Sequence, residues 1–214
     1  MKIFRLLFII AMVFCVNIAY SQTNDLTKED MDQLLEQTKH KVNEFNGYIS
    51  FIAQKKRYKT LQEQTEVEQS KDEYIKQALR LFIGGGKAYT DNDGNYHLAP
   101  VMEVSSIARK TRRVRVTDRP IGVYLNNLKN MRYTEVTVTT GDAFFCSDAK
   151  QVGDDQYEVT LSFRQYFVGK TDGKVVYSDK TDKTVKVYIK KKVIDGRTRW
   201  TVLLGDIKVD ATEP

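Results

Sequence analysis

The sequence of 214 residues contains few cysteines, histidines, prolines and tryptophans: two, two, three and one, respectively. Cys15 lies in an N-terminal apolar segment, so a chain without that segment keeps only Cys146 and forms no intramolecular disulfide. A nucleophilic cysteine needs a histidine within reach. Beside Phe144 and Phe145, Cys146 is more typical of a small buried hydrophobic residue. We therefore expect the fold to be held by its core.

The scarcity of histidine also bears on metal and cofactor sites. His40 falls on a predicted helix and His97 in a turn-rich segment, so we expect both to face water. Residues 91–94, Asp-Asn-Asp-Gly, resemble the first half of a calcium loop, but the twelfth position is Met102 instead of the glutamate that completes such a site. The sequence predicts a tight turn there, no metal site and no cofactor.

Long apolar runs are limited to the N-terminus. Lys2 and Arg5 precede an apolar run at 6–14, and Ala19 and Ser21 are small residues at the positions that signal peptidase recognises. This pattern is typical of a cleaved secretory signal.

We therefore expect a signal peptide over 1–21, secretion across the inner membrane to the periplasm or cell surface, and no stable transmembrane segment after cleavage. An uncleaved membrane anchor needs roughly 20 apolar residues, and Asn17 and Tyr20 interrupt the run. A lipid anchor on Cys15 is a further alternative, although Phe14 is bulky for that processing.

Acidic residues are in modest deficit. The formal charge is +6, and removal of Lys2 and Arg5 with the leader lowers it to +4. The densest basic stripe contains Arg109, Lys110, Arg112, Arg113 and Arg115. It suits an anionic glycan, lipid headgroup or protein surface, or simply a solvated face. Because no aromatic residue interrupts it for base stacking, we expect no nucleic-acid partner.

Helical spacing of apolar residues predicts three helices. The first covers about 27–52 and opens with Thr27 and Asp30, and the second covers about 70–82 and opens with an S-x-x-E capping box. The polar segment 54–69 between them is either a further helix or an exposed connection. The third, at 120–131, opens with proline, which suits a first turn. The sequence thus divides into a helical front over 22–86 and a hairpin with the third helix over 87–131.

The remaining segment, 132–209, predicts an antiparallel meander. Gln156–Val168 alternates apolar and polar residues, as expected of a strand with one buried face. The other strands are expected near 132–140, 143–151, 175–177, 183–193 and 198–209. Short turns containing Asp and Gly separate them, so neighbours should be antiparallel. We expect one α+β domain over 22–214.

This layout resembles the nuclear transport factor 2-like superfamily. The resemblance is carried by the helix Ile121–Met131 with Tyr124, Leu125 and Leu128, the strand Gln156–Val168 with Phe163 and Phe167, and the closing strand Trp200–Val209. It implies a strongly curved antiparallel sheet packed around three helices as a cone with a pocket. The alternative is the cystatin-like fold, which has one helix across such a sheet.

The resemblance implies either of two kinds of function. Many exported bacterial members are non-catalytic binding or protein-association modules. The enzymes are isomerases, cyclases and dehydratases that use a pocket aspartate, or a histidine–aspartate pair, as general base. No catalytic motif carries over to this sequence.

Gln165 is the anomaly of the long strand, because it takes the position between Phe163 and Phe167 on the apolar face. A buried amide needs a hydrogen-bond partner, so either it meets backbone, water or ligand, or the strand bulges and the amide is half-exposed. Gln165, Tyr177, Tyr124, Phe163, Phe167 and Trp200 are the candidate ligand-binding residues.

Asp206 is the candidate general base. It follows Gly205 inside the closing strand, where glycine often marks a bulge. It points either into the cone, with a raised pKa, or outward. Tyr177 and Asp179 indicate either a polar rim or a solvated turn.

The function predicted from the sequence is a non-catalytic envelope module that binds a protein, a glycan or a small apolar ligand. An enzyme with a pocket aspartate is the alternative, and a homodimer through the sheet is possible with either.

Overall fold

The computed structural model describes residues 26–91, 94–108 and 113–213, without the side chains of Arg197 and Thr198. The chain divides into two compact units, Met1–Met31 and Asp32–Pro214. The predicted signal peptide, 1–21, and Arg109, Lys110 and Arg112 of the basic stripe lie outside the described residues. No helix within the described ranges has the length and apolar character needed to cross a membrane.

Helix α2 (Lys28–Ala53) begins at the predicted capping residues. The Thr27 hydroxyl accepts a hydrogen bond from the Asp30 backbone N–H at 3.1 Å, and Asp30 Oδ2 accepts one from Thr27 N–H at 3.0 Å. These reciprocal bonds satisfy N–H groups that a first helical turn leaves without acceptors. The helix continues through Gly47, since a single glycine costs only about 1 kcal/mol.

Helix α3 (Leu61–Arg80) begins well before the predicted start at Ser70, so that prediction was wrong. Thr60 is the N-cap, and its hydroxyl accepts from Glu63 N–H at 3.1 Å. Ser70 lies inside the helix and donates to the Glu66 carbonyl oxygen at 2.8 Å. The first turns of α3 are exposed, so they carry no apolar stripe to signal a helix. Thr60 and Glu63 are themselves a T-x-x-E pair.

After α3 the chain turns through a short 3-10 segment, η1 (Ile83–Gly86), and a two-stranded hairpin of β1 (Tyr89–Thr90) and β2 (Tyr96–His97). Gly84, Gly85 and Gly86 all have positive φ angles, of 63°, 61° and 70°. Only glycine adopts this conformation without strain. The triple glycine therefore forms the connection from α3 to β1.

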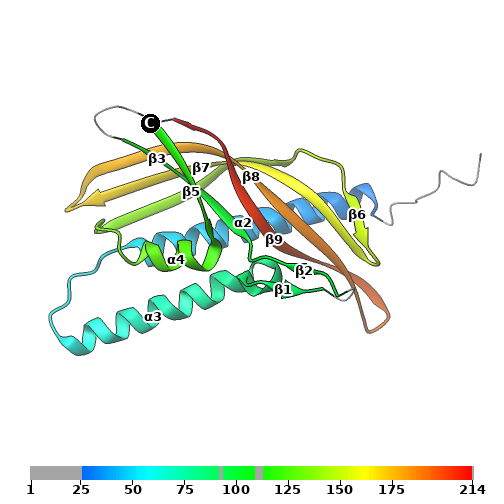
Figure 1. Ribbon diagram of the computed structural model, residues 1–214, viewed down its shortest axis with the longest axis horizontal. Coiled ribbons are helices and arrows are strands. Elements are labelled where there is room, and N and C mark those ends of the chain that lie inside the picture. Colours follow the sequence, from blue (N-terminus) through cyan, green and yellow to red (C-terminus); the bar gives the residue numbers. More distant parts are fainter. Residues whose placement is uncertain (1–25, 92–93, 109–112, 214) are drawn as a thin grey trace, which may run out of the picture. The chain divides into compact units, whose positions relative to one another are not determined.

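Within the described residues, seven strands form one mixed sheet in the order β4-β3-β9-β8-β7-β5, with β6 paired to β7 (Figure 1). They are β3 (Val101–Ile107), β4 (Val114–Pro120), β5 (Glu135–Phe145), β6 (Lys150–Gly153), β7 (Gln156–Thr171), β8 (Lys174–Ile194) and β9 (Arg197–Glu213). Helix α4 (Ile121–Leu128) directly follows β4. Neighbouring strands are antiparallel except β3 and β9, which are parallel. The prediction of a wholly antiparallel sheet was therefore wrong at β3.

Strand β8 is one strand of 21 residues, where the sequence predicted two strands with a turn between them. Alternate residues from Tyr177 to Ile189 share one face. Asp179, Thr181 and Lys183 are polar members of that face, so they interrupt the apolar pattern without ending the strand. Strand β4 was also not predicted, because its residues are mostly exposed and carry no buried apolar face.

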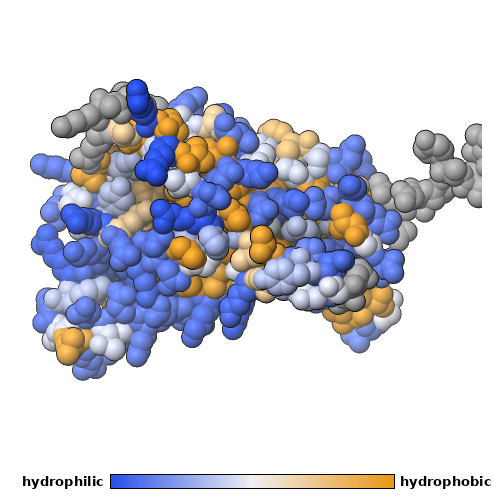
Figure 2. Space-filling view, in the orientation of Figure 1, coloured by the Kyte–Doolittle hydropathy of each residue, from blue (hydrophilic) through white to orange (hydrophobic). Residues whose placement is uncertain are grey.

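One face of the sheet forms the core with the helices. It contributes fully buried residues from three strands: Val159, Leu161, Val185, Val187, Val202 and Leu204. Phe45 of α2 contacts Phe82 edge-on at 5.0 Å between ring centroids. Helix α3 lies along α2, where Tyr74 contacts Phe51 at 4.2 Å (Figure 1). The surface in Figure 2 is mostly hydrophilic, with hydrophobic residues in small separate groups.

Three local predictions are confirmed. Asp172-Gly173 and Asp195-Gly196 connect β7 to β8 and β8 to β9 with positive φ at both residues, as tight hairpins require. A bulge lies at Gly205-Asp206, because Val187 pairs with Leu204 while Val185 pairs with Ile207. In contrast, Cys146 is exposed and not buried.

Candidate functional site

A cavity of about 200 Å³ lies on the helix-facing side of the sheet, where the inward residues of β8 change from apolar to polar. Strands β3, β7 and β8 and the segment from α4 to β5 form its walls. Its lining residues are Val104, Ser105, Ser106, Tyr124, Met131, Tyr133, Gln165, Phe167, Tyr177, Asp179, Thr181 and Lys183. Because they come from segments far apart in the chain, only the tertiary fold assembles the cavity.

Lys183 and Gln165 form the most deeply buried polar pair of this lining. Lys183 has 4% of its surface exposed and Gln165 has 7%. Lys183 Nζ donates to Gln165 Oε1 at 2.8 Å, and Gln165 Nε2 donates to Asn46 Oδ1 at 2.6 Å. Asn46 Nδ2 in turn donates to Thr140 Oγ1 at 2.7 Å. The Gln165 amide thus bonds at both ends, which explains how it is buried between two phenylalanines.

Asp179 and Tyr177 form a second polar pair in the cavity. The Tyr177 hydroxyl donates to Asp179 Oδ2 at 2.6 Å, and the Thr181 hydroxyl lies 3.5 Å from Asp179 Oδ1. Ser105 of β3 extends this group, since its hydroxyl lies 3.4 Å from that of Thr181. Carboxylate, phenol and two hydroxyls therefore gather on one side of Lys183.

Burial shifts the protonation equilibria of the charged groups. Loss of solvent lowers the pKa of Lys183 to about 8, although the negative charge of Asp179 partly opposes that change. Loss of solvent raises the pKa of Asp179, and the hydrogen bond from Tyr177 and the charge of Lys183 oppose that rise. The pKa of Tyr124 is also raised, by burial first and the charge of Asp179 second. The lysine and the carboxyl are thus both closer to neutrality than exposed groups.

Aromatic rings line the other side of the cavity. Phe167 lies 5.9 Å from Tyr133 and 5.8 Å from Tyr177, both edge-on between ring centroids. Gly169 allows Tyr133 to pack against β7, because a Cβ there would lie 2.8 Å from the Tyr133 ring. The cavity therefore has an aromatic side and a polar side, an arrangement that suits a small ligand with an apolar body and one polar group.

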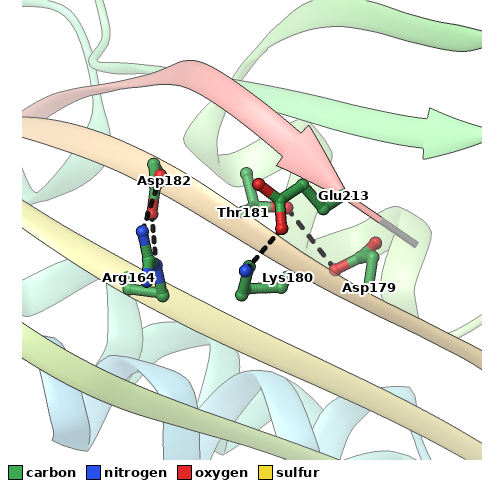
Figure 3. Close-up of polar contacts among 6 residues, drawn as sticks. All are labelled: Arg164, Asp179, Lys180, Thr181, Asp182 and Glu213. Atoms are coloured by element: carbon green, nitrogen blue, oxygen red, sulfur yellow. Dashed lines mark hydrogen bonds and ion pairs between the residues drawn. The ribbon is translucent and has the colours of Figure 1, made fainter.

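The opposite face of β8 has ordinary surface ion pairs. Arg164 and Asp182 make a bidentate contact, with Nε–Oδ1 and Nη2–Oδ2 distances of 2.6 and 3.1 Å (Figure 3). Lys180 pairs with Glu213 on the neighbouring strand (Figure 3). Lys180 and Asp182 alternate along β8 with Asp179 and Thr181, so the polar residues of this segment lie on both faces of the strand.

Four of the six candidate ligand-binding residues line the cavity: Gln165, Tyr177, Tyr124 and Phe167. Phe163 is buried but is not part of the lining. Trp200 belongs to a separate groove with Lys41, Lys190 and Lys192.

Asp206 is placed outside the cavity lining. Its Oδ1 accepts a hydrogen bond from the Val101 backbone N–H at 2.8 Å, which ties the start of β3 to β9. The carboxyl that does enter the cavity is Asp179. Of the basic stripe, Arg113 and Arg115 are exposed residues beside and within β4.

Lys183, Thr181, Ser105 and Tyr133 were not predicted as site residues, and Asp179 was predicted only as part of a polar rim or a solvated turn. Asp179, Thr181 and Lys183 could have been found from the sequence. The alternation from Tyr177 to Ile189 is unbroken, so these three residues lie on the same face of the strand as buried Val185. Ser105 and Tyr133 had no comparable signal, because their contribution depends on how distant segments pack.

Within the described residues, no cluster of histidine, cysteine, aspartate and glutamate has the geometry of a metal site. The chain matches no protein-family profile, and no curated protein or solved structure is significantly similar to it. The geometry of the cavity is therefore the main guide to function.

Proposed function

We propose that this protein is an exported, non-catalytic binding module of the bacterial cell envelope, and that its cavity binds a small ligand with an apolar body and one polar group. The observation that carries the proposal is the division of the cavity between the aromatic side, with Phe167 and Tyr133, and the buried polar side, with Lys183 and Gln165. A core that served stability alone would gain more from apolar residues at these buried positions.

The volume limits the ligand. About 200 Å³ is the space of roughly seven water molecules, and it lies below the ~300–1,000 Å³ of sites for drug-sized ligands. A single substituted aromatic ring is the size class that fits.

The N-terminal sequence pattern supports the envelope setting. Lys2, Arg5 and the apolar run at 6–14 have the pattern of a secretory signal. We propose further that the sheet curves into a cone of the nuclear transport factor 2-like type. The order of elements supports that assignment: two helices, four short strands, a third helix and then an antiparallel meander that contains the long strands β7, β8 and β9.

Titration of the protein with benzyl alcohol, followed by amide NMR, tests the binding proposal. We expect shift changes grouped on the lining residues of β7 and β8, and loss of binding in Ser105→Phe, which fills the cavity. Ser162→Phe, on the opposite face of β7, is the matched control and should still bind. Shift changes spread over the surface, or none at saturating probe, would contradict the proposal.

A second function is favoured by one observation, the half-buried carboxyl of Asp179 with its raised pKa and its bond from Tyr177. In this alternative the protein is a small enzyme of the isomerase, cyclase or dehydratase type, and Asp179 is its general base. It predicts exchange of deuterium into the α-carbon of cyclohexanone, abolished in Asp179→Asn. No exchange above the buffer rate would exclude this chemistry for that ketone class.

A further inference from the structure

We propose that Lys183 is a carbonyl-reactive amine whose Nζ forms a reversible imine with a small aldehyde or ketone held in the cavity. This proposal rests on the proposed binding function and names its ligand class. It differs from the enzyme alternative, because it assigns the covalent step to the lysine and not to a carboxyl.

The position of the lysine is the first argument. Its side chain lies in the lining of the cavity, yet only 4% of its surface is exposed. Within the part of the chain that the structure describes, Gln165 Oε1 is its one hydrogen-bond acceptor. An ammonium group has three N–H donors, so two hydrogen positions are not engaged by the described residues. The amine is thus held by one hydrogen bond, to Gln165 Oε1, and can still contact a ligand in the cavity.

The second argument is the protonation state. Only a neutral amine attacks a carbonyl carbon, and desolvation in an apolar pocket is a known route to such a lysine. Burial lowers the pKa of Lys183 to about 8, so about half of the amine is neutral at that pH. An exposed lysine with a pKa near 10.4 is neutral in roughly one molecule in 250 at pH 8. The other titratable groups of the lining are Tyr124, Tyr133, Tyr177 and Asp179.

The third argument concerns the proton transfers that imine formation requires. The amine lone pair forms the C–N bond, the carbonyl oxygen takes up protons and leaves as water, and the product is an imine. Amine and carbonyl thus give imine and water, with no oxidant or reductant. Asp179 is the candidate proton carrier, because it lines the same cavity as Lys183 and its charge acts on that lysine. The aromatic side formed by Phe167 and Tyr133 would hold the apolar part of the ligand.

Lys71 is an internal control for burial. It is 3% exposed, and its pKa is lowered, chiefly by desolvation. However, its Nζ donates to the Gln54 backbone carbonyl at 2.8 Å, and it does not line this cavity. If burial alone made a lysine reactive, both would react. If the cavity is required, only Lys183 would.

The test is reductive trapping on the wild-type protein, so that no variant has to fold. The protein is incubated at pH about 8, the pKa of Lys183, with benzaldehyde and cyanoborohydride, and benzylated lysines are located by peptide mass spectrometry. We expect Lys183 to be labelled more than about tenfold faster than exposed Lys174, because its neutral fraction is roughly 100-fold larger and its lower basicity offsets part of that gain. Lys71 should stay unlabelled, and benzyl alcohol should protect Lys183.

The outcomes separate this proposal from the one on which it rests. If benzyl alcohol binds at the lining but Lys183 is not labelled faster than Lys174, the carbonyl proposal is wrong and the binding function stands. Equal labelling of Lys71 and Lys183 would also overturn it. If benzyl alcohol neither binds nor protects and Lys183 is not labelled, both proposals fail.

Discussion

Two lysines are buried among the described residues, and they occupy contrasting surroundings. Lys71 projects from α3 to the Gln54 carbonyl oxygen, just beyond the end of α2, where a cation is favoured by the helix dipole. Lys183 projects from β8 to the side-chain amide of Gln165 beside a cavity. Lys71 joins two helices, whereas Lys183 lines a cavity together with the Asp179 carboxyl and the Tyr177 phenol.

The contrast shows that burial of a charged residue does not by itself indicate a site. Both lysines have a lowered pKa, with desolvation as the main cause. What differs is the partner, a backbone carbonyl for Lys71 and a side-chain amide for Lys183. A side-chain partner can be removed by substitution while a backbone carbonyl cannot, so the two environments can be tested separately.

The largest effect should come from Gln165→Leu. This substitution leaves Lys183 Nζ without its acceptor and Asn46 Oδ1 without its donor. Each buried group left unpaired costs about 1–3 kcal/mol, so urea denaturation should show a loss of about 2–6 kcal/mol. Gln54→Leu is the control, since it retains the backbone acceptor of Lys71, and it should cost under about 1 kcal/mol. Equal costs for the two would remove the distinction between the lysines.

The next effect is a pH dependence. The pKa of Lys183 is about 8 in the folded protein and about 10.5 without the fold, so between these values the unfolded state binds more protons and stability rises with pH. At about 1.36 kcal/mol per pKa unit, wild type should gain about 3 kcal/mol relative to Lys183→Met over this range. The free energy of unfolding, measured by urea denaturation at a series of pH values, checks it. Parallel curves for the two proteins would show that Lys183 is charged in the fold.

Lys71→Met should cost about 1.5–3 kcal/mol, the usual worth of a hydrogen bond from a charged donor, because the Gln54 carbonyl loses its partner. Thermal and urea unfolding measure the loss. Benzyl alcohol affinity should not change, as Lys71 is remote from the lining. A weaker affinity in this variant would mean that the two lysines are coupled.

The smallest effect should follow Asp179→Asn. The negative charge of Asp179 opposes the lowering of the Lys183 pKa, so its removal should bring that pKa below about 8. Since half of the amine is already neutral there, the neutral fraction at that pH can rise at most about twofold. The pH at which trapping reaches half its maximum rate is the diagnostic quantity, and an upward shift would contradict the assigned role of this charge.

Local patterns predicted much of the fold. Alternation identified β7, capping residues identified the start of α2, and Asp-Gly pairs identified the hairpins of the meander. The start of α3 and strand β4 were missed, because both are exposed and carry little of the apolar periodicity that reveals an element. Strand β8 was divided in two because polar residues at 178–182 were taken for a turn, whereas they continue the alternation.

The candidate site was predicted only in part. Gln165 was conspicuous because an amide replaced an apolar residue in a regular pattern. Asp206 was predicted as the general base because it lies within a predicted strand, whereas Asp179 was placed near a strand end. In the structure, a bulge lies at Asp206, and its carboxyl accepts a hydrogen bond from the Val101 N–H. The groove around Trp200 shows that an aromatic residue on a predicted strand need not face the same space as its neighbours.

The sequence alone determined helices α2 and α4, strand β7 and its buried face, and the hairpin turns of the meander, since these follow from side-chain spacing along a few neighbouring residues. The tertiary structure alone decided that Gln165, Lys183 and Asn46 meet in one hydrogen-bonded chain, and that Asp179 and not Asp206 faces the cavity. The reason is physical: strand register and helix packing set these distances across more than a hundred residues of sequence, and local spacing carries no information about them.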